Sequence, residues 1–217
     1  MSRTHYYEEM KALARQIRLK HGLTTPRVRR SDLRRIYKPY DIQFDLWPLK
    51  GAPSTVKLKS LRGAFFYDEC GVTIMVNRFL PDAPAIFTMA HEFKHFLVDR
   101  DIGTLWCGDD NQNEEIEIGA EVFAAELMFP EQDFRDNLIQ MGIRKGECTP
   151  EVLVRLKRET QATLSYAGLV KKAEFLGFAP LGSLAGVKWQ QVEEQIYGEP
   201  VYKQIQRYHR QTKKTAQ

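Results

Sequence analysis

The feature that most constrains this chain is the pentapeptide His91-Glu92-Phe93-Lys94-His95, an HExxH sequence within its 217 residues. Residues four apart lie on one face of an α-helix, with Cβ atoms about 5–6 Å apart, so two imidazoles at this spacing can bind one metal ion. A glutamate directly after the first histidine can take a proton from metal-bound water without itself binding the metal. The pattern therefore predicts a metal-binding helix with Glu92 as a general base.

Two solvated histidines on an exposed helical turn are the alternative interpretation of this motif. The residues around it are mostly large and apolar, which is typical of a buried helix rather than an exposed one. Buried imidazoles need polar partners, so this context favours a metal site. The apolar residues are Phe87, Met89, Ala90, Phe93, Phe96, Leu97 and Val98.

The expected metal is one Zn²⁺ per chain, held by three protein ligands with the fourth position left to water. No other histidine lies near the motif in the sequence, so we expect a carboxylate from a later helix as the third ligand. Glu117 is favoured because it shares a helix face with Ala120 and Ala124, whose small side chains allow two helices to approach closely. Glu121, one turn later, is expected to hydrogen-bond a ligand histidine. The acids considered are Glu114, Glu115, Glu117, Glu121 and Glu126.

Hydrophobic periodicity predicts an α+β fold, in which a small mixed or antiparallel sheet packs on the HExxH helix and on the helix bearing Glu117. The C-terminal third has helical patterns throughout, with Thr149 and Pro150 as a helix start and Gly177 as a helix stop. The predicted helices are 4–20, 31–38, 88–98, 116–129, 152–156 and 164–176, with a last helical stretch from Gln190; the predicted strands are 42–46, 64–67 and 72–76.

Two further side chains near the motif are candidates for a role at the site. Tyr67 and Asn77 belong to the predicted hairpin and are oxyanion or outer-sphere candidates. An aromatic residue in a hairpin is also expected in the core, which is the alternative for Tyr67. The hairpin strands have two interpretations. One of them is a sheet edge that pairs with a peptide substrate, or both are internal strands of the sheet.

Composition excludes several other classes of protein. The chain is 43% hydrophobic and 28% charged, as in an ordinary globular protein. Its apolar runs are far shorter than the ~20 residues of a membrane-spanning helix, and its N-terminus carries no apolar signal segment. Three separated cysteines indicate neither a disulfide framework nor a thiolate zinc site. We therefore expect a cytoplasmic protein with no membrane partner.

The net charge of +4 is unevenly distributed along the chain. Residues 1–40 carry a net charge of +8, residues 41–150 of −9, and residues 151–217 of +5. Basic ends are compatible with nucleic-acid binding or with ion pairing to the acidic centre. Because no nucleic-acid-binding motif accompanies them, direct nucleic-acid binding is not expected.

Four segments with conspicuous motifs follow one another in the sequence: Gly63–Tyr67, Ile74–Asn77, Phe87–His95 and Glu117–Pro130. In these segments, and over roughly residues 8–180, the chain resembles the ImmA/IrrE family of metallopeptidases. The resemblance implies a gluzincin-like protease with helical segments attached to it.

By this resemblance, His91, His95 and Glu117 bind the metal and Glu92 is the general base. The chain departs from the family pattern at Glu121, where the family often has Asn, and at Met128-Phe129, where it often has Leu-Met. Neither departure removes a ligand. Lys94 stands where the family often has Gly, which adds a cation near the site.

The resemblance also implies a partner and an organisation into three parts. The expected substrate is a protein, in particular a helix-turn-helix repressor of a mobile element, a prophage or a stress response. The expected parts are a metallopeptidase domain with N-terminal helices at 1–148, a helix-turn-helix-like region at 149–182, and a helical extension with a basic tail at 183–217. The alternatives are a non-catalytic regulator that binds a repressor or DNA and whose metal is structural, and a toxin–antitoxin or defence component. An intact Glu92 argues against a structural metal, which needs no base.

Overall fold

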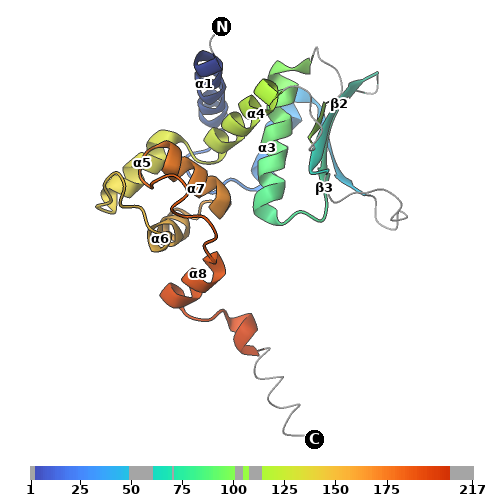
Figure 1. Cartoon of the computed structure of the whole chain (residues 1–217). Helices are drawn as coiled ribbons and strands as arrows, with labels where there is room; N and C mark the ends of the chain where they lie inside the picture. The colour runs from blue at the N-terminus through green and yellow to red at the C-terminus, as the bar shows by residue number, and fades with distance from the viewer. Residues whose placement is uncertain (1–2, 49–60, 70, 101–104, 108–113, 206–217) are drawn as a thin grey trace, which may run out of the picture.

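A computed structural model describes residues 3–48, 61–69, 71–100, 105–107 and 114–205, the segment 105–107 by its backbone alone. The predicted α+β class is confirmed, with strands in the first half and helices throughout (Figure 1). The sequence also predicts a polar loop at 109–113 and a basic tail at 209–217, and both lie outside the described residues. The elements are α1 Arg3–His21, α2 Arg30–Tyr37, the 3₁₀ helix η1 Lys38–Tyr40, β1 Ile42–Trp47, β2 Gly63–Asp68, β3 Gly71–Asn77, α3 Asp82–Val98, β4 Leu105–Cys107, α4 Glu114–Met128, α5 Glu131–Gln140, α6 Pro150–Thr160, α7 Tyr166–Phe175 and α8 Trp189–Tyr197.

The sheet is mixed, with strand order β1-β3-β2-β4. β2 and β3 form the predicted antiparallel hairpin, β1 pairs parallel with β3, and β4 pairs antiparallel with β2 over Gly63–Phe65. β3 therefore lies inside the sheet, and so does the first half of β2. The edge interpretation is wrong for these segments, because the outer described strands are β1 and β4.

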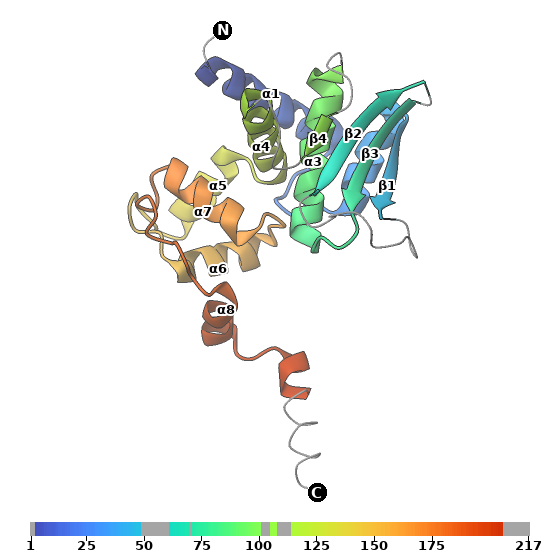
Figure 2. The same ribbon diagram turned by 45° about the vertical axis from the view of Figure 1, so that its right-hand side comes forward.

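The core is built in layers from the sheet outward. α3 lies against the sheet, and α4 and α1 lie beyond it (Figures 1 and 2). Two aromatic contacts connect these layers: the ring centroids of Phe65 in β2 and Phe96 in α3 are 6.5 Å apart, and those of Phe93 in α3 and Phe123 in α4 are 6.3 Å apart. α3 is thus buried between the sheet and α4, as its apolar composition predicts.

The helices differ from the sequence prediction at several points, and α6, for example, continues to Thr160, beyond the predicted 152–156. α3 begins at Asp82 and not near Thr88, because Pro84 falls in its first turn, where proline is tolerated. α5 was not predicted; its short apolar stripe is Phe134 and Leu138, which are both buried. The hydrophobic periodicity of residues 4–20 also places Leu19 among the apolar residues of α1, but this residue is 86% exposed.

The basic ends form ion pairs with the acidic centre, as one of the two interpretations of the charge distribution predicts. In α2, Arg30 lies 2.8 Å from Asp82 at the start of α3. Arg15 of α1 and Lys172 of α7 both pair with Glu126 of α4, at 2.9 and 3.4 Å. These contacts join α1 and α7 to the same face of α4.

The C-terminal helices have the caps expected from their sequence. The hydroxyl of Thr149 accepts a hydrogen bond from the amide of Val152, and that of Ser165 accepts one from the amide of Gly168. The segment between α6 and α7 is anchored to the N-terminal part, since the Thr163 amide donates to the Pro26 carbonyl at 3.2 Å. Among the described residues, no helix has the length and apolar character needed to span a membrane.

Candidate metal centre

The two histidines of the HExxH motif meet on one face of α3. They lie one turn apart, and both are buried, as are Phe93 and Phe96 between and beside them in the helix. The Nε2 atoms of His91 and His95 are 3.2 Å apart. Two nitrogen atoms thus point at the same small volume.

Glu117 brings a carboxylate to this volume from the first turn of α4. Its Oε2 lies 3.1 Å from Nε2 of His91, and its Oε1 lies 3.4 Å from Nε2 of His95. One ligand atom from each of the three residues falls within 4.8 Å of the others. The prediction of Glu117 assumed that the small residues on its helix face pack against another helix. Ala120 and Ala124 on that face are indeed fully buried.

This arrangement fits zinc in donor type and spacing. A tetrahedral ion with bonds of about 2.0–2.1 Å separates its ligand atoms by roughly 3.3–3.4 Å. The separations of 3.1, 3.2 and 3.4 Å among the three side chains are close to that value. Two imidazoles and one carboxylate are also a donor set typical of a catalytic zinc site.

The carboxylate that hydrogen-bonds a histidine of the cluster is Asp99, and not Glu121 as the sequence suggested. Oδ2 of Asp99, the residue that caps the C-terminus of α3, lies 2.7 Å from Nδ1 of His95. Glu121 is exposed and pairs instead with Lys171 of α7 at 3.3 Å. The missed signal is an aspartate four residues after the second histidine, on the same helix face.

Lys94 is fully buried, so the cation that the sequence places near the site has no solvent contact. Its Nζ lies 2.7 Å from Oδ2 of Asp99 and donates to the carbonyl of Ile116 at 3.1 Å. It also lies over the ring of Tyr6, 5.5 Å from the centroid. Because Ile116 directly precedes Glu117, this single ammonium group connects the metal helix to the start of α4.

Glu92 is fully buried between α3 and the sheet. The backbone of β2 crosses close to it: a Cβ atom placed on Gly63 would lie 2.8 Å from Oε1 of Glu92 and 2.4 Å from Cγ2 of Thr88. Glycine is thus required at position 63 for the strand to approach the helix this closely. The approach fixes the carboxylate next to the cluster.

The surroundings of Tyr67 and Asn77 are set by the sheet and the loops next to it. Tyr67 is 52% exposed, so the core interpretation is wrong. It lies four residues beyond Gly63, roughly 13 Å along the strand. Both ends of the Asn77 amide bond to the backbone: Nδ2 donates to the Leu61 carbonyl and Oδ1 accepts from the Phe79 amide, both at 2.9 Å.

The electrostatics of the cluster favour a positive charge at its centre. Burial lowers the pKa of His91. Burial also disfavours the charged form of His95, but hydrogen bonds with Asp99 and Glu117 outweigh it and raise the pKa to about 9. For Glu117, burial is outweighed by hydrogen bonds with the two histidines, which lower the pKa to about 2. A metal cation would replace the proton that these groups otherwise share.

The sequence matches a known family of peptidases over the segment that contains the cluster. A family model described as the IrrE N-terminal-like domain, Peptidase_M78, matches residues 54–165. The matched span contains α3 and α4, and with them the whole cluster and Asp99. No curated protein matches the chain significantly.

Proposed function

Because the chain belongs to the ImmA/IrrE family of peptidases, we propose that it is a zinc-dependent endopeptidase that hydrolyses a peptide bond in a protein substrate. The observation that carries this proposal is the convergence of His91, His95 and Glu117 next to the buried carboxylate of Glu92. A structural metal site would have no use for a buried carboxylate beside its ligands.

The residues of the site have two roles, which are metal binding and proton transfer. His91, His95 and Glu117 would hold zinc, which when bound polarises the scissile carbonyl and lowers the pKa of a water molecule. Glu92 takes the proton from that water and passes it to the leaving amine. Asp99 accepts the Nδ1 proton of His95, so that Nε2 keeps its lone pair for the metal.

The proposed substrate is a DNA-binding repressor of the helix-turn-helix type, as the resemblance to the family implies. Such a substrate would place the reaction in the cytoplasm. We also retain the division into a peptidase part at 1–148, a helix-turn-helix-like region at 149–182 and an extension from 183 onward. The capped pair α6 and α7 supports the second of these parts.

The test compares the wild-type chain with Glu92→Gln, which keeps the side-chain shape and removes the base. New protein N-termini in cells producing each variant are identified by mass spectrometry. We expect termini that are present with the wild type and absent with Glu92→Gln, since a general base contributes roughly 10²–10⁴-fold to rate. Glu114→Gln, an equal change of charge at an exposed position, should behave as the wild type.

Zinc content measured on the same proteins separates loss of the base from loss of the metal. Glu92→Gln should bind zinc as the wild type does. Identical sets of new termini in wild type and Glu92→Gln would contradict the proposed mechanism.

A further inference from the structure

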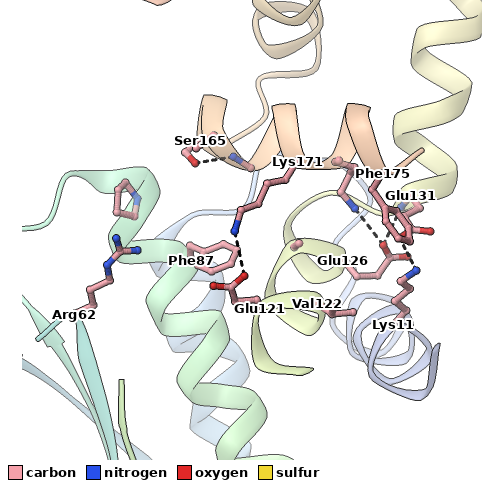
Figure 3. Close-up of a pocket in the computed structure, with 15 residues that line it drawn as sticks. Lys11, Arg62, Phe87, Glu121, Val122, Glu126, Glu131, Ser165, Lys171 and Phe175 are labelled. Carbon is pink, nitrogen blue, oxygen red and sulfur yellow. Dashed lines mark hydrogen bonds and ion pairs between the residues drawn. The ribbon is translucent and has the colours of Figure 1, made fainter. Parts of the chain in front are cut away.

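A cavity of about 400 Å³ lies between the peptidase helices and α7 (Figure 3). α3 and α4 form one wall and α7 forms the other. Most of the lining surface is apolar, and a cavity of this size and character is typical of a small-ligand or side-chain site. The apolar lining residues are Pro84, Phe87, Val122, Ala125, Ala167 and Phe175.

The lysines and glutamates along the walls neutralise one another, while Arg62 adds a cation on the side of β2. Each of three lysines from α1 and α7 pairs with a glutamate of α4 or α5, and Figure 3 shows Lys11, Lys171 and the three glutamates. A charged ligand that bound to one of these lysines or glutamates would have to break its ion pair, whereas an apolar ligand would not. The pairs are Lys11–Glu131 at 2.7 Å, Lys171–Glu121 at 3.3 Å and Lys172–Glu126 at 3.4 Å.

The cavity begins one helical turn from the metal cluster. Two lining residues show this. Phe87 precedes His91 by four residues on α3, and Glu121 follows Glu117 by four residues on α4, so each of the two shares a helix face with a residue of the cluster. A third lining residue, Arg62, directly precedes the glycine of β2 that abuts Glu92. Three elements therefore lead from the cluster into the same cavity.

We propose that this cavity receives a large apolar side chain of the substrate, on a residue close to the cleaved bond. The assignment rests on the proposed peptidase function. The fit is to a leucine, methionine or phenylalanine side chain, because most of the lining surface is apolar and the lysines and glutamates of the walls are already paired. It also gives α7 a role, since this helix of the C-terminal region completes the pocket.

The most exposed of the three ion pairs lies between α7 and α4. The Lys171–Glu121 ion pair joins the two walls, and its side chains are 76% and 53% exposed. Exposed ion pairs contribute little to stability, so this one can separate when a peptide enters. The pairs of Lys11 and Lys172 lie deeper and are better shielded.

The test uses two hydroxamates, acetohydroxamate and N-acetylphenylalanine hydroxamate, titrated into the zinc-loaded full chain by calorimetry. Both present the same metal-binding group, but only the second carries a large apolar side chain. We expect it to bind at least about tenfold more tightly, because burying a phenylalanine side chain is strongly favourable. Ala125→Phe fills the cavity and should abolish this preference without changing the affinity for acetohydroxamate or the zinc content.

Two further variants secure the interpretation. Ala185→Phe makes the same change at an exposed turn outside the cavity and should keep the preference. Ala167→Trp obstructs the pocket from an exposed position of α7, where folding is not at risk, and should lose it.

The failures of the pocket and of the metal site give different results. Equal affinity of the two hydroxamates for the wild type would overturn the proposal that the pocket receives a substrate side chain. A preference that survives in both Ala125→Phe and Ala167→Trp would overturn it as well. Binding of neither hydroxamate to the zinc-loaded chain would contradict the proposed function itself, and the pocket with it.

Discussion

Nδ1 of His95 lies 2.7 Å from Oδ2 of Asp99, and the same oxygen is 2.7 Å from the ammonium group of Lys94. One buried carboxylate therefore orients a metal-binding imidazole and neutralises a buried cation. The side chain of Asp99 determines which ring nitrogen faces Glu117, although it does not itself belong to the cluster.

Asp99→Asn is expected to weaken zinc binding by about 10–100-fold, the usual cost of losing such a partner. The amide keeps the size of the side chain but accepts the Nδ1 hydrogen bond less strongly than a carboxylate. The measurement is zinc affinity by competition with a chelator. Asp82→Asn, the same change at an exposed position of α3, is the control and should leave affinity unchanged. Equal affinities in the two variants would contradict the role of Asp99.

The third ligand is tested by two substitutions one helical turn apart. Glu117→Ala should lose most of the bound zinc, because two imidazoles alone form an incomplete catalytic site. Glu121→Ala should retain it, since Glu121 pairs with Lys171 and not with the histidines. Metal content by mass spectrometry separates these outcomes, and a zinc-depleted Glu121→Ala would show that the wrong acid has been assigned.

Lys94→Met is expected to lower the free energy of unfolding by about 3–5 kcal/mol, because it removes the ammonium group from the buried carboxylate of Asp99 and leaves only the ring of His95 as its partner. The matched control is Lys171→Met, which removes an exposed ion pair and should cost less than about 1 kcal/mol. Urea titration monitored by circular dichroism gives both values. Similar losses in the two variants would mean that the buried pair contributes no more than a surface one.

Zinc affinity should rise with pH from 6.5 to 8.5, by up to about 100-fold. The pKa of His95 in the metal-free protein is about 9, above its ordinary value of 6.5, and metal binding must displace this proton. The same shift stabilises the metal-free fold. That stabilisation is fully present below pH 6.5 and is lost as the pH rises through 9. Asp99→Asn removes the main favourable partner of the charged ring and should shift the rise in affinity to lower pH.

The parts of the site that the sequence predicted depend on short-range geometry. His91 and His95 share a face because they are four residues apart, and Glu117 was favoured because its helix face carries small residues. Asp99 was missed although the predicted helix 88–98 ends at the correct residue, because Asp99 lies one position beyond that end and its contact with His95 depends on the geometry of the C-cap.

The cavity was not predictable in the same way, because it depends on contacts between distant segments. Its α7 wall is held by Lys171 and Lys172, which pair with glutamates 50 and 46 residues earlier. The sequence showed a basic end and an acidic centre, but not which lysine meets which glutamate. Helix 164–176 was predicted, whereas its position beside the cluster was not.

Gly63→Ala tests whether the approach of β2 to α3 positions the base. The added Cβ would lie 2.4 Å from Cγ2 of Thr88 and 2.8 Å from Oε1 of Glu92, so both side chains must move. Overpacking of this kind costs about 1–3 kcal/mol, and displacement of Glu92 should also lower kcat.

The double variant Gly63→Ala/Thr88→Ser separates these two effects. Serine lacks the Cγ2 methyl group, so the double variant should recover part of the lost stability, while the contact with Glu92 remains and kcat stays low. Thr88→Ser alone is the control and should be fully active. Stability is read from urea titration, and kcat from cleavage of the substrate identified by its new N-terminus. If the double variant recovers stability and kcat together, the glycine serves packing alone and does not position Glu92.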